Sequence, residues 1–145
     1  MKEFVEQEII SAVKKLLSSQ VNELLCAMQQ QIPLIEFAEY KGGSVVTPVI
    51  SLVSSEHTEK ERVIRLESYT LTITFKFTET AESELHCYAY SGAVGRVIFD
   101  NPTLGGVANR AVITGKKYVS PVKPHCGEGW SLIITLRLTV EGVSA

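Results

Sequence analysis

The chain contains few cysteines and no long apolar run: it has 3 Cys and 1 Trp among 145 residues. A membrane-spanning helix needs about 20 consecutive apolar residues, so the sequence predicts no integral membrane protein. Three dispersed cysteines are too few for a disulfide scaffold, and an odd count is typical of a reducing compartment. Residues 1–8 are acidic and polar, whereas a signal peptide has an apolar core. We therefore expect a soluble protein of the cytoplasm.

A surplus of positive charge is also lacking, since 14 Lys and Arg face 16 Asp and Glu for a net charge of −2. This balance argues against nonspecific nucleic-acid binding, which draws its affinity from basic residues on phosphates. Residues 1–85 carry 8 basic and 13 acidic residues, and residues 86–145 carry 6 and 3. The simplest explanation is chance with local ion pairing. The alternative is a subunit with an acidic and a basic side, suited to head-to-tail packing around a ring.

Residues 2–31 have the pattern of an amphipathic helical pair. Apolar residues recur at spacings of three and four, namely Val5, Ile9, Ala12, Val13, Leu16, Leu17, Val21, Leu24, Leu25 and Met28. Residues 18–22 are weak helix formers and predict a break or kink. Pro33 ends the second helix, because the residue before a proline avoids the helical region.

After the helices the apolar period changes to two. We expect short strands over 34–40 and 45–53, with Pro48 marking an edge or a strand start. A charged connection follows over 54–62. Strands over 68–77 and 131–141 show the clearest alternation, with one apolar face and one polar face, as in an antiparallel sheet.

A third helix is predicted over 81–98, with Thr80 as its N-cap. Its apolar side consists of Ala81, Leu85, Tyr88, Ala89, Gly92, Val97 and Ile98, and Gly92 and Gly95 are expected to permit close packing against the sheet. A strand over 107–119, bent or interrupted at Gly115, and a loop over 125–129 complete the chain. The order α-α-β-β-β-α-β-β predicts one α+β domain over 1–145, a mostly antiparallel sheet covered by the N-terminal helices and one inserted helix.

Histidine and cysteine occur as two adjacent pairs, His86-Cys87 and His125-Cys126. Adjacent residues point in different directions, and the usual ligand spacing of structural zinc is absent, so we expect no metal site. Cys26 and Cys87 are expected to be buried as small hydrophobic residues. A Cys–His nucleophile pair would need an orienting third group, which the sequence does not identify.

Other site chemistries also lack their signatures. The glycines form neither a phosphate-binding loop nor a dinucleotide fingerprint. The carboxylates lie in charged surface runs, with no apolar setting that would raise a pKa for acid–base work. The aromatic residues are best explained as core. We therefore expect no enzymatic activity and no cofactor, although a small enzyme or ligand-binding domain remains an alternative.

One loop stands out: Asp100-Asn101-Pro102-Thr103-Leu104-Gly105-Gly106-Val107, between the third helix and the next strand. It combines a helix stop, a proline-set turn and a double glycine that permits positive φ. It resembles the Asp…Thr-Leu-Gly-Gly segment common in tail terminator (tail completion) proteins of long-tailed bacteriophages and prophages, where it also follows a helix and opens a strand. The order of helices and strands is similar over most of the chain.

The resemblance implies a structural virion protein, assembled in the bacterial host cytoplasm. Such proteins form a homo-oligomeric ring, a hexamer by the symmetry of the tail, that caps the tail tube and stops its polymerisation. The implied partners are further copies of the chain, the tail tube protein and the head–tail connector, with no nucleic-acid sequence recognition and no membrane. Another neck or head–tail joining component of related fold is the nearest alternative.

Two segments are predicted to make subunit or tube contacts. The first is the loop, a short rigid turn beside a sheet edge, and the second is the charged connection, as solvated charge at a hairpin tip. The residues in question are Asp100, Pro102, Thr103, Leu104, Gly105 and Gly106, together with Glu56, Glu59, Lys60, Glu61 and Arg62.

Overall fold

The computed structural model describes residues 5–28, 32–37, 45–60, 64–78, 82–121 and 128–141, with only the backbone at 45, 58–60, 64, 65 and 128. The elements are α1 (Val5–Leu16), the π-helical segment η1 (Leu17–Val21), α2 (Asn22–Ala27), β1 (Leu34–Ile35), β2 (Val45–Val46), β3 (Val49–Lys60), β4 (Ile64–Thr78), α3 (Ser83–Asp100), β5 (Arg110–Val119) and β6 (Glu128–Glu141). The predicted α+β class is confirmed.

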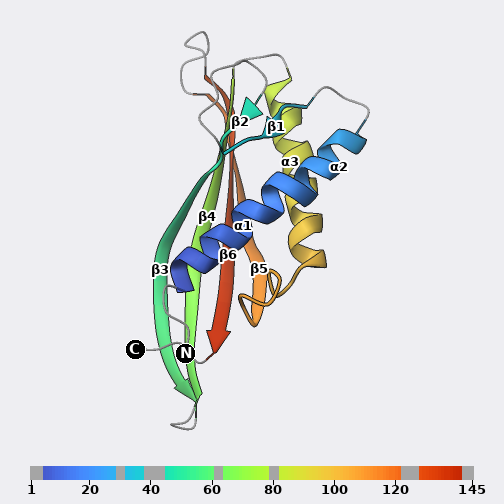
Figure 1. The fold of residues 1–145 in the computed structure, drawn as a ribbon. Helices are drawn as coiled ribbons and strands as arrows, with labels where there is room; N and C mark the ends of the chain where they lie inside the picture. Colours follow the sequence, from blue (N-terminus) through green and yellow to red (C-terminus); the bar gives the residue numbers. More distant parts are fainter. Residues whose placement is uncertain are drawn as a thin grey trace.

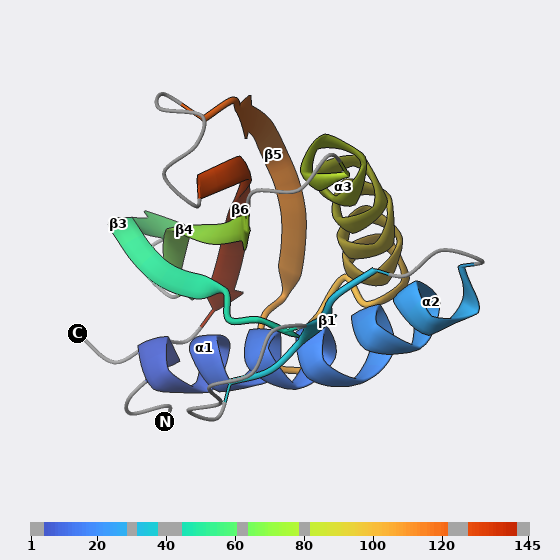
Figure 2. The same ribbon diagram turned by 90° about the horizontal axis from the view of Figure 1, so that it is seen from above.

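The principal sheet has four antiparallel strands in the order β3-β4-β6-β5, so β3 and β5 are its edge strands (Figure 1). All helices lie on one side of this sheet, and α1 crosses it diagonally (Figures 1 and 2). The two-residue strands β1 and β2 pair in parallel beside them. The chain is thus a two-layer sandwich with one sheet face covered by helices.

The N-terminal helix continues through the predicted break, which takes the form of the π-helical segment. Its buried residues recur every fourth position: Val5, Ile9, Val13, Leu17, Val21 and Leu25. In an α-helix of 3.6 residues per turn, four residues make about 40° more than one full turn, so a stripe with this spacing drifts around the helix and away from the sheet. The more slowly wound π segment brings the stripe back toward the sheet. Ser18 and Ser19 donate from Oγ to the Lys14 and Lys15 carbonyls, at 2.9 and 2.6 Å.

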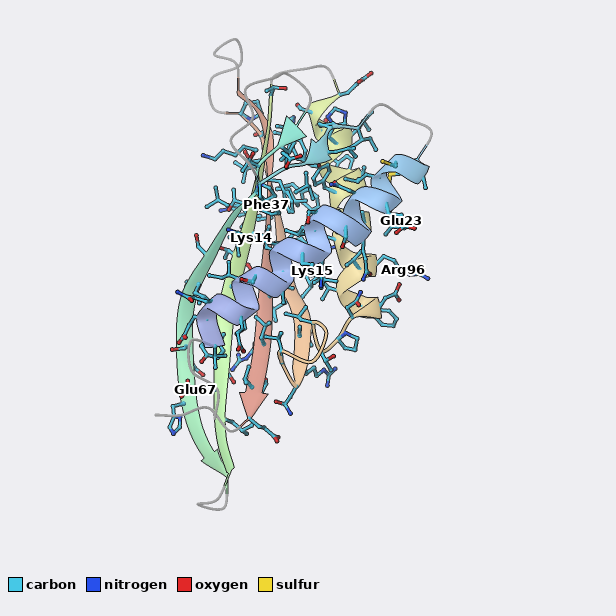
Figure 3. All side chains as sticks on the ribbon, viewed as in Figure 1. Lys14, Lys15, Glu23, Phe37, Glu67 and Arg96 are labelled. Atoms are coloured by element: carbon cyan, nitrogen blue, oxygen red, sulfur yellow. The ribbon has the colours of Figure 1, made fainter. Side chains whose placement is uncertain are left out.

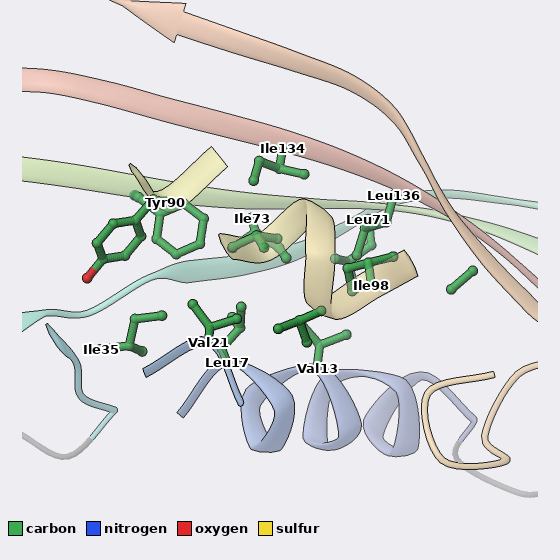
Figure 4. Packing of buried hydrophobic residues seen from close by; sticks show 14 of the residues in the cluster. Val13, Leu17, Val21, Ile35, Leu71, Ile73, Tyr90, Ile98, Ile134 and Leu136 are labelled. Carbon is green, nitrogen blue, oxygen red and sulfur yellow. The ribbon is translucent and has the colours of Figure 1, made fainter. Parts of the chain in front are cut away.

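The predicted alternation of β4 and β6 is confirmed. Residues Tyr69, Leu71, Ile73, Phe75 and Phe77 of β4 and Leu132, Ile134, Leu136, Leu138 and Val140 of β6 are all buried. Val13, Leu17 and Val21 point at this layer from below (Figure 4). The opposite face carries threonines of β4 and β6, among which Thr72 lies directly opposite Thr135. One sheet face is therefore core and the other is polar.

Tyr90 of α3 joins the layers. Its ring packs edge-on against Phe75 and Phe77, with centroids 5.1 and 4.9 Å apart, and its hydroxyl donates to the Pro33 carbonyl.

At the outside of α1, Lys14 Nζ lies 5.6 Å from the ring centroid of Phe37 (Figure 3).

Several predicted strand boundaries are wrong. The connection predicted over 54–62 is β-strand as far as Lys60, because β3 pairs with β4 along its whole length. The strand predicted over 34–40 is only β1, and residues 38–40 lie outside the described residues. Pro48 precedes an edge strand, and β5 shifts register between Ile113 and Gly115, as predicted.

The predicted apolar side of α3 is partly wrong. Val97 and Ile98 are buried, but Leu85, Tyr88 and Gly92 are exposed, and the covered face includes Cys87, Tyr90 and Val94 instead. Gly92 has nothing within 4 Å of an added Cβ, whereas Gly95 faces Lys116 Nζ at 3.2 Å. Thr80 and Ala81 lie outside the described residues, and the helix extends two residues beyond the predicted 98, to Asp100, where the loop was predicted to stop it.

Candidate functional site

The 100–107 loop is a compact turn that reverses the chain between α3 and β5. The Leu104 N–H donates to the Asn101 carbonyl, and the Gly106 and Ala108 N–H groups both donate to the Thr103 carbonyl, each at 3.0 Å. Leu104, Gly105 and Gly106 have φ of 51, 74 and 95°. Three successive left-handed residues explain the double glycine, because only glycine adopts this conformation without steric cost.

The Leu104 side chain anchors the loop to the hydrophobic core. It is 3% exposed, so within one copy of the chain it offers little surface to the contact predicted for this loop. Pro102, Thr103, Gly105 and Gly106 are exposed around it. Asn101 ties the loop to the helical layer, donating from Nδ2 to Gln20 Oε1 and to the Val97 carbonyl, both at 2.8 Å. The loop therefore presents rigid backbone and small side chains.

An open groove of about 670 Å³ lies between this loop and the N-terminal helix. Its apolar lining comes from Ala12, Leu16, Leu104 and Val107, and its polar rim includes Glu8, Lys15 and Asn101. None of the described histidines or cysteines lines it.

The predicted charged segment lies on the other edge of the sheet. Glu56 is exposed on β3 and forms a 3.5 Å ion pair with Arg137 of β6, while His57 Nδ1 lies 2.6 Å from Glu67 Oε1. Glu59 and Lys60 belong to β3 by backbone, and Glu61 and Arg62 lie outside the described residues. The loop leads into β5, so the structure places the two predicted contact segments at opposite edges (Figure 1).

Exposed hydrophobic side chains lie on both edge strands and on α3. In the described part of the chain, the large ones are Val49 and Val53 on β3, Val112 and Tyr118 on β5, and Leu85, Tyr88 and Phe99 on α3. Tyr88 and Tyr118 pack together with ring centroids 5.6 Å apart, so the outer side of α3 adjoins the β5 edge. The sequence reasoning missed most of these residues, because it assigned apolar residues of regular elements to the core.

The two edge strands differ in charge. β5 carries Arg110, Lys116 and Lys117 and no acidic residue, whereas β3 carries Glu56, Glu59 and Lys60. Lys116 is exposed, and its Nζ donates to the Ser91 carbonyl of α3 at 3.0 Å. Ser91 Oγ lies 2.8 Å from the Tyr118 hydroxyl. A β-bulge between Leu52 and Ser54 interrupts β3. Bulges and edge lysines are devices that limit uncontrolled pairing of free strands.

The thiols do not form a reactive site in the described residues. Cys87 is buried beside Glu84 on α3, and burial, with a smaller effect of that carboxylate, raises its pKa from 9.0 to about 11. A thiol with a raised pKa is a poor nucleophile at neutral pH. Cys26 is exposed, contrary to the prediction of burial. His125 and Cys126 lie outside the described residues.

No group of three or more His, Cys, Asp or Glu side chains within the described ranges is arranged to hold a metal ion. Among the helices described, none is long and apolar enough to cross a membrane. The chain matches no known protein-family model, and no curated protein matches its sequence.

Proposed function

We propose that this chain is a tail terminator protein of a long-tailed phage or prophage, a non-enzymatic virion component. Copies of it close into a ring of about six subunits on the finished tail tube, stop tube growth and offer the surface that joins the head. The support from the sequence is the 100–107 loop, set between a helix and a strand, together with the order of helices and strands.

The observation that carries the proposal is the pair of unlike edges of one sheet. Neither β3 nor β5 has a second strand partner among the described residues, so each leaves one row of backbone groups without a partner strand. At the start of β5 the Ala111 N–H donates to the Pro102 carbonyl of the loop, and the loop thus covers the beginning of this edge. One edge is acidic and apolar, with Glu56 and Val53, and the other is basic and apolar, with Lys117 and Val112. Two different, complementary edges favour a head-to-tail contact over a symmetric one.

A head-to-tail contact produces a ring when its rotation closes and a filament when it does not. A protein that ends a polymer therefore needs a subunit contact whose rotation closes a ring, so that its copies form one layer on the tube and no filament. The 100–107 loop leads into β5, so its exposed residues lie beside this contact. In this proposal the loop stiffens the receiving edge, with Leu104 holding it to the core.

The direct test is a tube-growth assay with a purified tail tube protein of the same phage or prophage as this chain. Negative-stain images should show tubes that stop lengthening after the protein is added, with a ring at one end. Tubes that keep growing at the same rate, with bare ends, would refute a terminator role. An alternative head–tail joining component would bind tube ends only after a separate terminator has bound.

A further inference from the structure

The two edge strands of the principal sheet run in opposite directions. β3 is antiparallel to β4, β4 to β6 and β6 to β5, so β3 and β5 are antiparallel to each other within one copy. In a ring whose copies continue one sheet, β3 of one copy therefore lies antiparallel to β5 of the next copy. Addition of a strand to a free sheet edge is a common mode of recognition. This arrangement rests on the head-to-tail contact of the proposed function.

β3 offers one long regular stretch to a second strand. Its register against β4 shifts between Leu52 and Ser54, and from Ser54 the pairing is regular as far as Lys60. A bulge bends the strand and breaks the even spacing of its backbone groups, so a partner strand pairs regularly on one side of it. The segment 54–60 is the longer regular part of this edge.

β5 offers a regular stretch at its far end. Its register against β6 shifts between Ile113 and Gly115, and the pairing is regular from Gly115 to Val119. Its beginning is closed, because the Ala111 N–H donates to the Pro102 carbonyl. An antiparallel strand that enters beside residue 119 runs toward this closed end. The 100–107 loop therefore limits how far the incoming strand can extend.

From these stretches we infer the register of the subunit contact: β3 of one copy pairs with β5 of the next so that residue 56 faces residue 117. Residues 54–58 then lie opposite 119–115, which brings the two bulge-free stretches together. Lys60, where β3 ends, lies just beyond the closed start of β5. In this contact the 100–107 loop is the stop for the incoming strand, and the partner on the β5 edge is a second copy of the chain.

Charge supports this register. It sets Glu56 opposite Lys117 at the middle of the paired stretch. Both are exposed and lie at positions that face away from the helices, since their strand partners, Ser68 and Ile133, alternate with buried residues. Glu56 uses Oε2 for its 3.5 Å ion pair with Arg137, so Oε1 remains for a second cation. Opposite charges directly across two antiparallel strands stabilise their pairing.

The unshifted register, in which the rows of paired residues in one sheet continue into the next, is disfavoured. Followed across the sheet, these rows would set Ser54 against Val112 and residue 55 against Ala111. The Ala111 N–H is already bonded to the loop, so the incoming strand would collide with it. Closing a sheet into a ring also requires a stagger between strands, which the unshifted register lacks.

The test is disulfide trapping in the full chain, with native mass spectrometry of the same samples. Ser54→Cys and Val119→Cys in one chain place two thiols directly opposite each other across the contact, within the reach of a disulfide. Within one copy these positions lie on the two outer strands of the sheet, so such a disulfide joins two copies. Oxidation with copper phenanthroline should give a ladder of covalent oligomers on a non-reducing gel. Glu56→Cys with Lys117→Cys should give the same ladder.

Ser54→Cys with Val112→Cys is the matched control, because it tests the unshifted register with the same β3 thiol. It should give no more cross-linking than the single variants, which account for the natural cysteines. A ladder from this control, or no ladder from either inferred pair, in samples where native mass spectrometry shows a ring would overturn the register and leave the ring in place. A chain that forms no oligomer at all would overturn the head-to-tail contact itself, and the register with it.

Discussion

At the scale of single residues, the 100–107 loop depends on backbone conformation more than on side-chain chemistry. Leu104 has a φ of 51°, unusual for a residue with a Cβ, and its burial compensates for that cost. The following glycines continue the turn at φ of 74 and 95°. The Thr-Leu-Gly-Gly sequence is thus explained by one buried anchor and two conformationally permissive residues.

Two glycine substitutions separate this backbone effect from packing. Gly105→Ala should lower the free energy of unfolding by about 1 kcal/mol, because alanine disfavours a left-handed φ. Gly92→Ala, on α3, should raise it by about 0.5–1 kcal/mol. Neither added Cβ would meet an atom within 4 Å, so the pair is matched in space. Urea denaturation in dilute protein measures both, and equal effects would contradict the conformational explanation.

Burial of Cys87 predicts a loss of stability at alkaline pH. Its pKa is about 11 in the folded chain against an ordinary 9.0, so the folded state holds the thiol proton more tightly. That advantage is fully present below pH 9 and is lost as pH rises toward 11. The unfolding free energy should fall over this interval, and the fall should be shallower in Cys87→Ala. Identical pH profiles for the two proteins would show that this thiol is not responsible.

At the scale of elements, Asn22 connects the N-terminal helix to β1. Its Oδ1 accepts from the Ile35 N–H at 2.8 Å, and its Nδ2 donates to the carbonyls of Ile35 and Ser18, at 2.9 and 3.0 Å. Asparagine at the start of α2 had indicated only a weak helix former. In the fold, the Asn22 side chain bonds the N–H and the carbonyl of Ile35, which a neighbouring strand would otherwise bond.

Asn22→Ala should therefore cost about 1–3 kcal/mol, since two partly buried backbone groups of Ile35 lose their partner. Ser19→Ala is the control: that hydroxyl is exposed and bonds only a carbonyl of its own helix, so the change should stay within about 0.5 kcal/mol. Thermal or urea unfolding compares them. Equal losses would mean that the Asn22 bonds contribute nothing beyond the helix itself.

The elements differ in how well the sequence predicts them. β4 and β6 alternate strictly, so their positions and buried faces follow from the period of two. α3 is harder, because its covered face includes a serine, a cysteine and a tyrosine while leucine and phenylalanine face outward. Residues 54–60 read as a charged connection, yet they pair with β4, since an edge strand can keep charged side chains in solvent.

At the scale of the whole molecule, the first 85 residues carry most of the acidic residues, and the remaining residues carry a surplus of basic ones. In the fold, part of this difference appears as a difference in charge between the two edge strands, β3 and β5. Some of the imbalance is local pairing, as in Glu56 with Arg137. The remainder leaves β5 with basic residues only. That these edges sit at opposite ends of one sheet could not be predicted, because strand order depends on long-range pairing.

Charge reversal tests whether the two edges meet. Glu56→Lys on β3 or Lys117→Glu on β5 should each reduce the assembled fraction, because like charges then face each other across the contact. Carrying both changes in one chain should recover assembly. Circular dichroism checks that the fold is kept, as both side chains are exposed. If each single variant assembles as well as the unmodified chain, these side chains take no part in the contact.

The measurement that tests the central claim most directly is native mass spectrometry of the full chain over a range of concentrations, with negative-stain images of any large species. A head-to-tail contact that closes predicts a discrete ring of about six subunits, with no open series of larger oligomers. Monomers and dimers alone at every concentration, or an unlimited ladder of oligomers, would contradict a closed ring built on the two edges of the sheet.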